Sequence, residues 1–246
     1  RLPEVGRTLV ALGEYAERRR RGIAQFPPVR ETDPDVAVEA ALAEYGIAGP
    51  ASGFSESASG VGDVAAKTGF PVALKIVSPQ AVHKTEVGGV TLNIGSPEEA
   101  VEAAEKMEDR LRKHDPDAAI DGFLVQQMVG GLEVIVGVRD DPQFGPVLAL
   151  GFGGVLVEAM GDVAFRLLPV AAEDVAEMIG ELRAKALLGP FRGAPPRDVA
   201  ALIGCAVGLS NAYLDMRDRV SDIEINPLMV GADGDGVCAV DIRAIP

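Results

Sequence analysis

The residues most able to do chemistry lie in two short stretches of this 246-residue chain. The first, KIVSPQAVHKTEVGGV, begins at Lys75 and holds His83, one of only two histidines, and the glycine pair Gly88 and Gly89. Paired glycines let backbone N–H groups approach an anion closely, and a lysine supplies positive charge. A neutral imidazole is also a nucleophile near pH 7 and can accept a phosphoryl group. A loop of this composition can hold phosphate.

Each of these residues also has an ordinary structural explanation. A lysine in the apolar run PVALKIV can extend its side chain to solvent from an edge strand. A loop histidine such as His83 is often a surface or capping residue. The other histidine, His114, lies at the end of a predicted helix, where the helix dipole favours a cation. The residues alone therefore leave both interpretations of Lys75 and His83 open.

The second stretch is SDIEINPLMV, near the C-terminal end of the chain. Glu224 and Asn226 are two residues apart, so they share a face of the predicted strand, and Asp241 lies on the neighbouring run VCAVDIRAI. Such hard oxygen ligands suit Mg²⁺, which usually takes one or two carboxylates and completes its shell with water and phosphate oxygens. The alternative is that Asp222, Glu224 and Asn226 form the polar half of an alternating strand.

A third stretch, GFGGVLVE at residues 151–158, places a glycine-rich turn beside Glu158. Glycines also serve ordinary tight turns and bulges, so this stretch alone indicates little. The sequence lacks the Walker A pattern and the GxGxxG fingerprint, which disfavours those two nucleotide-binding folds. It also lacks an HExxH motif and a Ser-His-Asp elbow.

Composition sets broad limits on the class of protein. With 48% hydrophobic residues the chain can bury a real core, and its net charge of -14 disfavours nonspecific nucleic-acid binding. We find no apolar run of membrane-spanning length and no secretory signal, so we expect a cytoplasmic protein with no membrane partner. Cys205 and Cys238 lack disulfide or zinc spacing and are predicted to be buried free thiols.

The pattern of elements predicts an α+β protein with two lobes that meet near residue 122. A helix over residues 1–21 and a proline-rich linker precede a helix that starts at Asp33 and Pro34 and ends near Gly46. PVALKIV and TLNI are predicted strands, and Ser96, Pro97 and Glu99 form a capping box that opens a helix to about residue 113.

From Asp121 onward the chain becomes rich in β-forming residues, which predicts a second, antiparallel sheet. Its predicted members are FLVQQMV, LEVIVGVRD, PVLALGF and VAFRLLPV. Helices over residues 172–184 and 196–217 then precede the final pair of strands, which the turn GADGDG joins.

Six ordered motifs carry a resemblance to a known family: LKIVSPQAVHKTEVGGV, FLVQQMV, GLEVIVGVRDDPQFGPVLALGFGGVLVE, FRG, IEINPL and AVDIRA. From about residue 32 to its end, the chain resembles the ATP-grasp part of NDP-forming acyl-CoA synthetases. The similarity is to the ADP-forming acetyl-CoA synthetase beta subunit and, more distantly, to the succinyl-CoA synthetase beta subunit. It implies a two-lobed ATP-grasp fold: a helical linker at 1–30, lobe 1 with a mobile histidine loop at 31–121, and lobe 2 with the metal site at 122–246.

The resemblance also implies roles for individual residues. His83 would be catalytic, taking a phosphoryl group from a histidine of the CoA-ligase part and delivering it to ADP. Asn226 and Asp241, with Glu224 as a third, would bind Mg²⁺. The implied nucleotide-binding residues include Lys75 at the phosphates and the glycine pair Gly88 and Gly89. Gln126, Gln127 and Met128 would form the hinge at the adenine, and Glu133 would lie near the ribose. Gly153 and Gly154, in the glycine-rich turn, complete the set.

The implied reaction is acyl-CoA + ADP + phosphate ⇌ carboxylic acid + CoA + ATP, with Mg²⁺ as cofactor and ATP or ADP as substrate. The partners would be CoA-binding and CoA-ligase domains, in the same longer chain or in a separate alpha subunit, so this chain would be one part of the enzyme. One alternative is a non-catalytic module that senses nucleotide or acyl-CoA in a fused acyltransferase. Another is a different ATP-grasp carboxylate ligase, which would share the lysine and metal positions but would not need HKTEVGGV.

Overall fold

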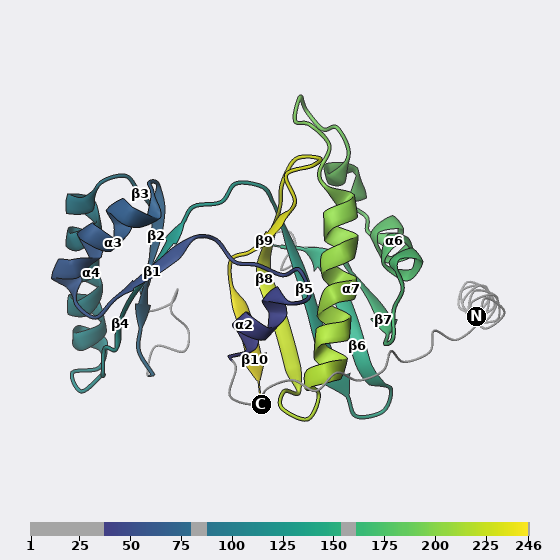
Figure 1. Ribbon diagram of the computed structural model, residues 1–246, viewed down its shortest axis with the longest axis horizontal. Helices are drawn as coiled ribbons and strands as arrows, with labels where there is room; N and C mark the ends of the chain where they lie inside the picture. Colours follow the sequence, from purple (N-terminus) through teal and green to yellow (C-terminus); the bar gives the residue numbers. More distant parts are fainter. Residues whose placement is uncertain (1–36, 80–87, 154–160, 246) are drawn as a thin grey trace. The chain divides into compact units, whose positions relative to one another are not determined.

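The structure is a computed structural model that describes residues 37–79, 88–153 and 161–245 (Figure 1). The chain divides into two compact units. The described part of the small unit comprises residues 48–79, 88–132 and 238–240, and that of the large unit comprises residues 37–47, 133–153, 161–237 and 241–245. The predicted linker at 1–30 and the predicted helix start at Asp33 and Pro34 lie outside the described residues.

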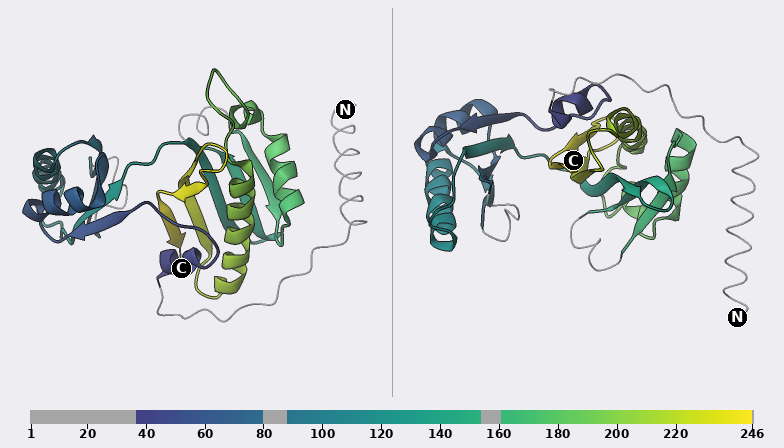
Figure 2. Two further views of the ribbon diagram at one scale, coloured as in Figure 1. Left: turned by 45° about the horizontal axis from the view of Figure 1, so that its top comes forward. Right: turned by 90° about the horizontal axis from the view of Figure 1, so that it is seen from below.

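The small unit is a four-stranded antiparallel sheet with helices on one face (Figures 1 and 2). The strand order is β1-β4-β2-β3, for β1 (Ser52–Ser55), β2 (Val72–Val77), β3 (Val90–Ile94) and β4 (Gly122–Gln127). The helices are η1 (Ala58–Gly60), α3 (Val61–Thr68) and α4 (Pro97–His114). Val72, Leu74 and Ile76 of β2 belong to one core cluster with Met107 of α4, so the other face of β2 carries Ala73, Lys75 and Val77.

The predicted start of α4 is confirmed, with one difference in the hydrogen bonds. Ser96 Oγ accepts from Glu99 N at 3.1 Å, which caps the helix. Glu99 Oε2 accepts from Gly95 N at 2.8 Å, one residue before the position that a capping box requires. Pro97 is the first helical residue, where its missing N–H leaves no helical bond unmade.

The structure corrects the predicted placement of FLVQQMV. The strand itself is confirmed as β4, but it lies in the small unit, because every residue from Gly122 to Gln127 pairs with β2. On its other edge β4 pairs with β1, so it is an inner strand of that sheet. The units therefore meet after Leu132 and not near residue 122, because β-rich composition identifies a strand without identifying its partners.

The large unit contains a sheet with the strand order β10-β8-β5-β6-β7. The pairs β10-β8, β5-β6 and β6-β7 are antiparallel. The strands are β5 (Leu132–Asp141), β6 (Gly145–Phe152), β7 (Val163–Leu167), β8 (Asp222–Val230) and β10 (Ile242–Ile245). The predicted single strand VCAVDIRAI is two strands: the short β9 (Val237–Ala239), which pairs with β8, and β10, with Val240 and Asp241 between them.

The described helices cover one face of this sheet, and we call the face without helices the open face (Figure 2). They are α2 (Val38–Ala43), α6 (Ala172–Glu181), η2 (Lys185–Leu188) and α7 (Val199–Met216). On β5, Val134, Val136 and Val138 are buried on the helix side, whereas Ile135 and Gly137 alternate with them on the open side. This alternation decides which side chains can meet a ligand on the open face.

Helix α7 is the only helix, within the described ranges, whose length and apolar composition would allow it to cross a membrane. Half of it is buried in the protein, as expected for a core helix. It also carries Cys205, whose predicted burial is confirmed, while Cys238 is half-buried. Burial raises the pKa of the Cys205 thiol to about 12.

Candidate functional site

The predicted metal ligands of β8 lie on the open face of the large unit. Glu224 and Asn226 alternate with Ile223 and Ile225, which are fully buried on the helix side. Asn226 Nδ2 donates to Glu224 Oε1 at 3.1 Å, which confirms that the two side chains share a face. Because the amide uses its NH₂ group on Glu224, its carbonyl oxygen Oδ1 remains as the atom suited to a cation.

Asp241 immediately precedes β10 and lies beside Asn226. The register of β8 and β10 pairs Glu224 with Arg243, and Asn226 N donates to the Asp241 carbonyl oxygen at 2.9 Å. Continuing this register places Asp241 opposite Asn226, and opposite residues of an antiparallel pair project to the same face. The structure therefore brings all three predicted ligands together, with the cationic Arg243 in the next row.

Glu224, Asn226 and Asp241 can supply some, but not all, of the oxygen ligands that Mg²⁺ needs. Across the described ranges, no group of three or more His, Cys, Asp and Glu residues could hold a metal ion. The predicted set has two carboxylates and one amide, and Mg²⁺ needs no more protein ligands when phosphate and water oxygens complete its shell. The residues thus suit a metal that arrives with a nucleotide better than a permanently bound metal.

A groove of about 330 Å³ lies on the same open face, next to Glu224. At Gly137 of β5, an added Cβ would lie 3.7 Å from the Glu224 Cβ and 3.3 Å from the Ile223 carbonyl oxygen, so the glycine keeps the strands close beside the carboxylate. Arg139 contributes a positive charge to the groove, and apolar side chains form most of the walls of the groove. Its lining comprises Ile135, Gly137, Val138, Arg139, Asp141, Val147, Ala149, Val163, Phe165, Asp222 and Glu224.

Glu133 and Gly153 meet where β5 begins and β6 ends. Gly153 N donates to the Glu133 carbonyl oxygen at 2.8 Å, one position beyond the last strand pair, Val134 and Phe152. An added Cβ at Gly153 would lie 3.0 Å from the Glu133 Cβ and 3.2 Å from its carbonyl carbon. A glycine permits this close approach without displacing the neighbouring strand. Gly154 and Glu158 lie outside the described residues.

Lys75 lies on the face of the small unit's sheet that the helices leave open. Its strand β2 is flanked by β4 and β3, so the edge-strand explanation of this lysine is wrong. The side chain is 8% exposed, and Nζ donates to the Val240 carbonyl oxygen at 3.2 Å. The burial excludes a side chain that extends to solvent, and a buried ammonium group is retained only where acceptor groups surround it.

Gln126 shares this face, because it is opposite Ala73, two residues before Lys75 on β2. Its Oε1 atom is buried and finds no hydrogen-bond partner within the described part of the chain. Buried acceptors without a partner are uncommon, and a ligand that donates a hydrogen bond would satisfy this one. Gln127 ends β4 with an exposed side chain, and Met128 follows it, donating through its backbone N to the Pro71 carbonyl oxygen.

The glycine pair is placed by the sheet itself. Gly88 has a φ of 66°, and an added Cβ there would lie 3.2 Å from Arg110 Nη1. The Gly89 carbonyl oxygen accepts from Ile76 N at 2.9 Å and so extends the pairing of β2 with β3. The left-handed backbone explains Gly88 without a ligand. His83 lies outside the described residues.

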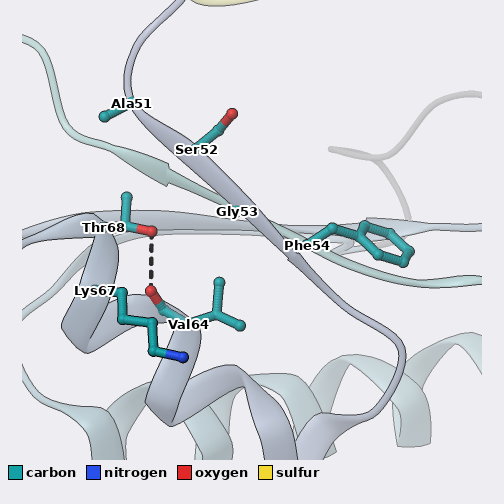
Figure 3. A pocket seen from close by; sticks show the side chains of 7 residues that line it. All are labelled: Ala51, Ser52, Gly53, Phe54, Val64, Lys67 and Thr68. Carbon is teal, nitrogen blue, oxygen red and sulfur yellow. Dashed lines mark hydrogen bonds between the residues drawn. The ribbon is translucent and has the colours of Figure 1, made fainter.

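Another cavity of the small unit, of about 370 Å³, contains none of the predicted site residues (Figure 3). It lies between the edge strand β1 and helix α3, and Figure 3 shows Thr68 Oγ1 donating to the Val64 carbonyl oxygen beside Lys67. Sequence reasoning made no assignment for residues 47–70, because the short β1 has no strong periodic pattern. Lys67, which lines this cavity, offers a control for substitutions of Lys75.

The chain belongs to the ATP-grasp class of proteins, because residues 30–245 match the ATP-grasp domain family. The architecture is accordingly the predicted α+β ATP-grasp fold. The chain is 38% identical, over 83% of its length and 87% of the relative, to the beta subunit of acetate–CoA ligase [ADP-forming] II of Pyrococcus furiosus.

Two further relatives extend the comparison. The chain is 36% identical to 4-hydroxybutyrate–CoA ligase [ADP-forming] of Nitrosopumilus maritimus, over 82% of this chain but only 29% of that protein. Acetyl-coenzyme A synthetase 1 of Ca. Korarchaeum cryptofilum, solved with coenzyme A and Mg-AMPPCP, has a TM-score of 0.69 at 33% identity and covers 83% and 87% of the two chains. In that structure the phosphohistidine segment points towards the nucleotide-binding site.

Proposed function

We propose that this chain is the nucleotide-binding ATP-grasp part of an ADP-forming acyl-CoA synthetase. The complete enzyme would catalyse acyl-CoA + ADP + phosphate ⇌ carboxylic acid + CoA + ATP. The observation that carries the proposal is the oxygen-rich set on β8 and β10, in which Asn226 donates to Glu224 and to the Asp241 carbonyl oxygen. Such a set suits a magnesium–nucleotide complex, and the relatives named above are ADP-forming CoA ligases.

In this proposal the large unit provides the metal ligands and the groups near the ribose. Asn226 and Asp241 would hold Mg²⁺, and Glu224 would orient the Asn226 amide as well as adding negative charge. When bound, Mg²⁺ would neutralise charge on the nucleotide phosphates. Glu133 would accept hydrogen bonds near the ribose, in a position that Gly153 helps to fix, and Gly154 would be the other nucleotide-binding glycine of this turn.

The small unit would provide the groups for the phosphates and the base. Lys75 would neutralise phosphate charge, and Gly88 and Gly89 would position the loop that precedes β3. Gln126, Gln127 and Met128 would form the adenine hinge, where the unpartnered Gln126 Oε1 would accept a hydrogen bond from the base. We propose that the two units are the two lobes of the fold, with the segment at 1–30 as a helical linker.

His83 would carry the phosphoryl group between the two halves of the enzyme. The N–P bond of the phosphohistidine would break while an oxygen of the ADP β-phosphate forms the new P–O bond, which releases neutral or protonated imidazole and ATP. Support comes from the segment HKTEVGGV and from the K. cryptofilum enzyme, whose phosphohistidine segment points towards its nucleotide site. Lys75 would stabilise the charge on the transferring group.

The chain spans 29% of the single-chain 4-hydroxybutyrate ligase but 87% of the P. furiosus beta subunit, so the remaining functions belong to other regions. We propose CoA-binding and CoA-ligase domains as partners, in the same chain or in an alpha subunit, and a cytoplasmic location. Acyl selectivity would lie in those partners, because the two relatives with this shared part are named for acetate and for 4-hydroxybutyrate.

The test is reconstitution with the CoA-binding and CoA-ligase part of the same enzyme. ATP formation is measured from ADP, phosphate and a series of acyl-CoAs that begins with acetyl-CoA. His83→Ala should abolish ATP formation while Mg-ADP affinity, measured by calorimetry, stays within about twofold. His114→Ala is the matched control and should retain full activity. Full activity of His83→Ala would refute the relay, and Mg-ADP binding without turnover on any acyl-CoA would favour a regulatory module.

A further inference from the structure

The motif FRG, residues 191–193, takes no part in the site described above. It forms the tip of a short hairpin between η2 and α7, which extends beyond the end of α7 at the top of Figure 1. Phe191 N donates to the Ala194 carbonyl oxygen at 3.3 Å, and Ala194 N donates to the Phe191 carbonyl oxygen at 2.9 Å. These reciprocal bonds make Arg192 and Gly193 the two residues of a tight turn.

Both turn residues have a left-handed backbone. The φ angle is 48° at Arg192 and 85° at Gly193, as a two-residue hairpin turn of type I′ requires. Asparagine, aspartate or glycine is the usual choice at the first position, because other residues adopt this conformation at a cost of roughly 1 kcal/mol. The backbone therefore does not explain an arginine here, and the explanation must lie in its side chain.

The base of the hairpin is fixed to the rest of the large unit. Arg197 N donates to the Leu188 carbonyl oxygen at 2.8 Å and closes the base. The Asp198 carboxylate then joins the base to the turn GADGDG by accepting from Gly234 N and Gly236 N, while it also caps α7 through Ala201 N. Pro190, Pro195 and Pro196 restrict the two legs. The tip is therefore held in a defined position.

The tip presents a cation and an aromatic ring together. The Arg192 guanidinium lies 5.5 Å from the centroid of the Phe191 ring, and the ring residue is 41% exposed. The chain carries 37 acidic residues and a net charge of -14. Even so, none of the acidic side chains in the described ranges forms an ion pair with Arg192. The donor edge of this guanidinium is thus available to a group from outside the described chain.

We propose that the Arg192 hairpin docks onto the CoA-binding and CoA-ligase part of the complete enzyme, where Arg192 binds a carboxylate. This inference rests on the proposed function, which supplies the partner. Arginine and aromatic residues are enriched among the residues that dominate the energy of protein interfaces, and a planar guanidinium matches a carboxylate in two-pronged geometry. A convex tip with one cation suits insertion into a partner's concavity, whereas a free phosphate is normally held by several donors in a concave site.

The experiment measures the affinity of this chain for the CoA-binding and CoA-ligase part by calorimetry, without and with CoA. Arg192→Asn is the central variant, because asparagine tolerates the left-handed turn and removes only the guanidinium. We expect at least tenfold weaker binding, with unchanged Mg-ADP affinity and an unchanged midpoint of thermal unfolding. Arg192→Lys should lose part of the affinity, since a lysine keeps the charge without the planar fork. Arg112→Asn removes an exposed charge from the small unit and should bind as wild type.

Three results would overturn the proposal. Wild-type affinity of Arg192→Asn would show that the guanidinium makes no contact. Weaker binding only when CoA is present would identify a CoA phosphate, and not a carboxylate, as the group that Arg192 binds. Failure of the wild-type chain to bind the partner would remove the docking role, and the Mg-ADP titration of the same sample would show separately whether the nucleotide function stands.

Discussion

The open faces of the two sheets carry opposite kinds of polar group. In the small unit the open face holds the buried cation Lys75 and the unpartnered acceptor Gln126. In the large unit it holds Glu224 and Asn226 of β8, with Asp241 beside them. Phosphate requires positive charge and Mg²⁺ requires oxygen ligands, so the two faces offer different groups to a magnesium nucleotide. The two faces therefore differ in the group that each suits, a phosphate in the small unit and Mg²⁺ in the large unit.

The largest expected effect comes from removing an oxygen ligand of the large unit. Asn226→Ala should weaken ADP binding at least tenfold in the presence of Mg²⁺, because an amide oxygen and its link to Glu224 are lost together. With the metal chelated by EDTA, wild type and variant should bind ADP alike. Calorimetric titrations in both buffers measure this, with Asp233→Asn as a control for charge in the same unit. Equal affinity in Mg²⁺ would count against the metal assignment.

The cation of the small unit should behave differently. Lys75→Met keeps most of the side-chain volume and removes the ammonium group, so ADP affinity should fall about tenfold both with and without Mg²⁺. Lys67→Met, at the cavity of Figure 3, is the matched control and should bind as wild type. The same titrations apply. A loss at Lys67 and none at Lys75 would move the nucleotide site to the β1 cavity.

A smaller effect is expected at Gly153, beside the proposed ribose contact Glu133. Gly153→Ala would place a Cβ 3.0 Å from the Glu133 Cβ, so the strand ends must separate by a few tenths of an ångström. We expect a two- to fivefold loss of ADP affinity and about 1 kcal/mol of lost stability. Gly204→Ala in α7, where an added Cβ meets nothing within 4 Å, should not weaken binding and should slightly stabilise the helix. Denaturant unfolding and calorimetry separate the two outcomes.

Asp198 should affect stability and leave nucleotide binding unchanged. Backbone hydrogen bonds from Ala201, then Gly236 and Gly234, lower the pKa of its carboxyl group, against the opposing effect of burial. The carboxylate therefore stabilises the fold above its unfolded pKa of about 4, and this contribution is lost as the pH falls through the lower folded value. Asp198→Asn should lower the thermal midpoint at pH 7, and the difference from wild type should shrink towards pH 3. A difference independent of pH would contradict this role.

Much of this arrangement follows from the sequence. Glu224 and Asn226 could be placed on one face because side chains alternate along a strand, and Asp241 beside them because the two C-terminal runs pair. The Ser96 cap could be predicted because capping depends on neighbouring residues only. In contrast, the placement of β4 depends on contacts between segments far apart in the chain, so its composition could not assign it to a sheet.

Some site features could be recognised only in three dimensions. The unpartnered Gln126 Oε1 depends on which atoms surround it, and the contact between Gly153 and Glu133 depends on where two strands end. The burial of Lys75 excluded the edge-strand explanation that the sequence left open, since β2 is an inner strand. For Gly88 the structure supplies a turn explanation that the motif did not indicate.

The most direct test of the proposed nucleotide site, to which both units would contribute, is titration of ADP into this chain with Mg²⁺ and, in parallel, with EDTA. Both units contribute if ADP binds in both buffers and binds at least tenfold more tightly with the metal. That is the expected result, because Lys75 acts without the metal whereas Asn226 and Asp241 act through it. Absence of ADP binding in both buffers would contradict the account.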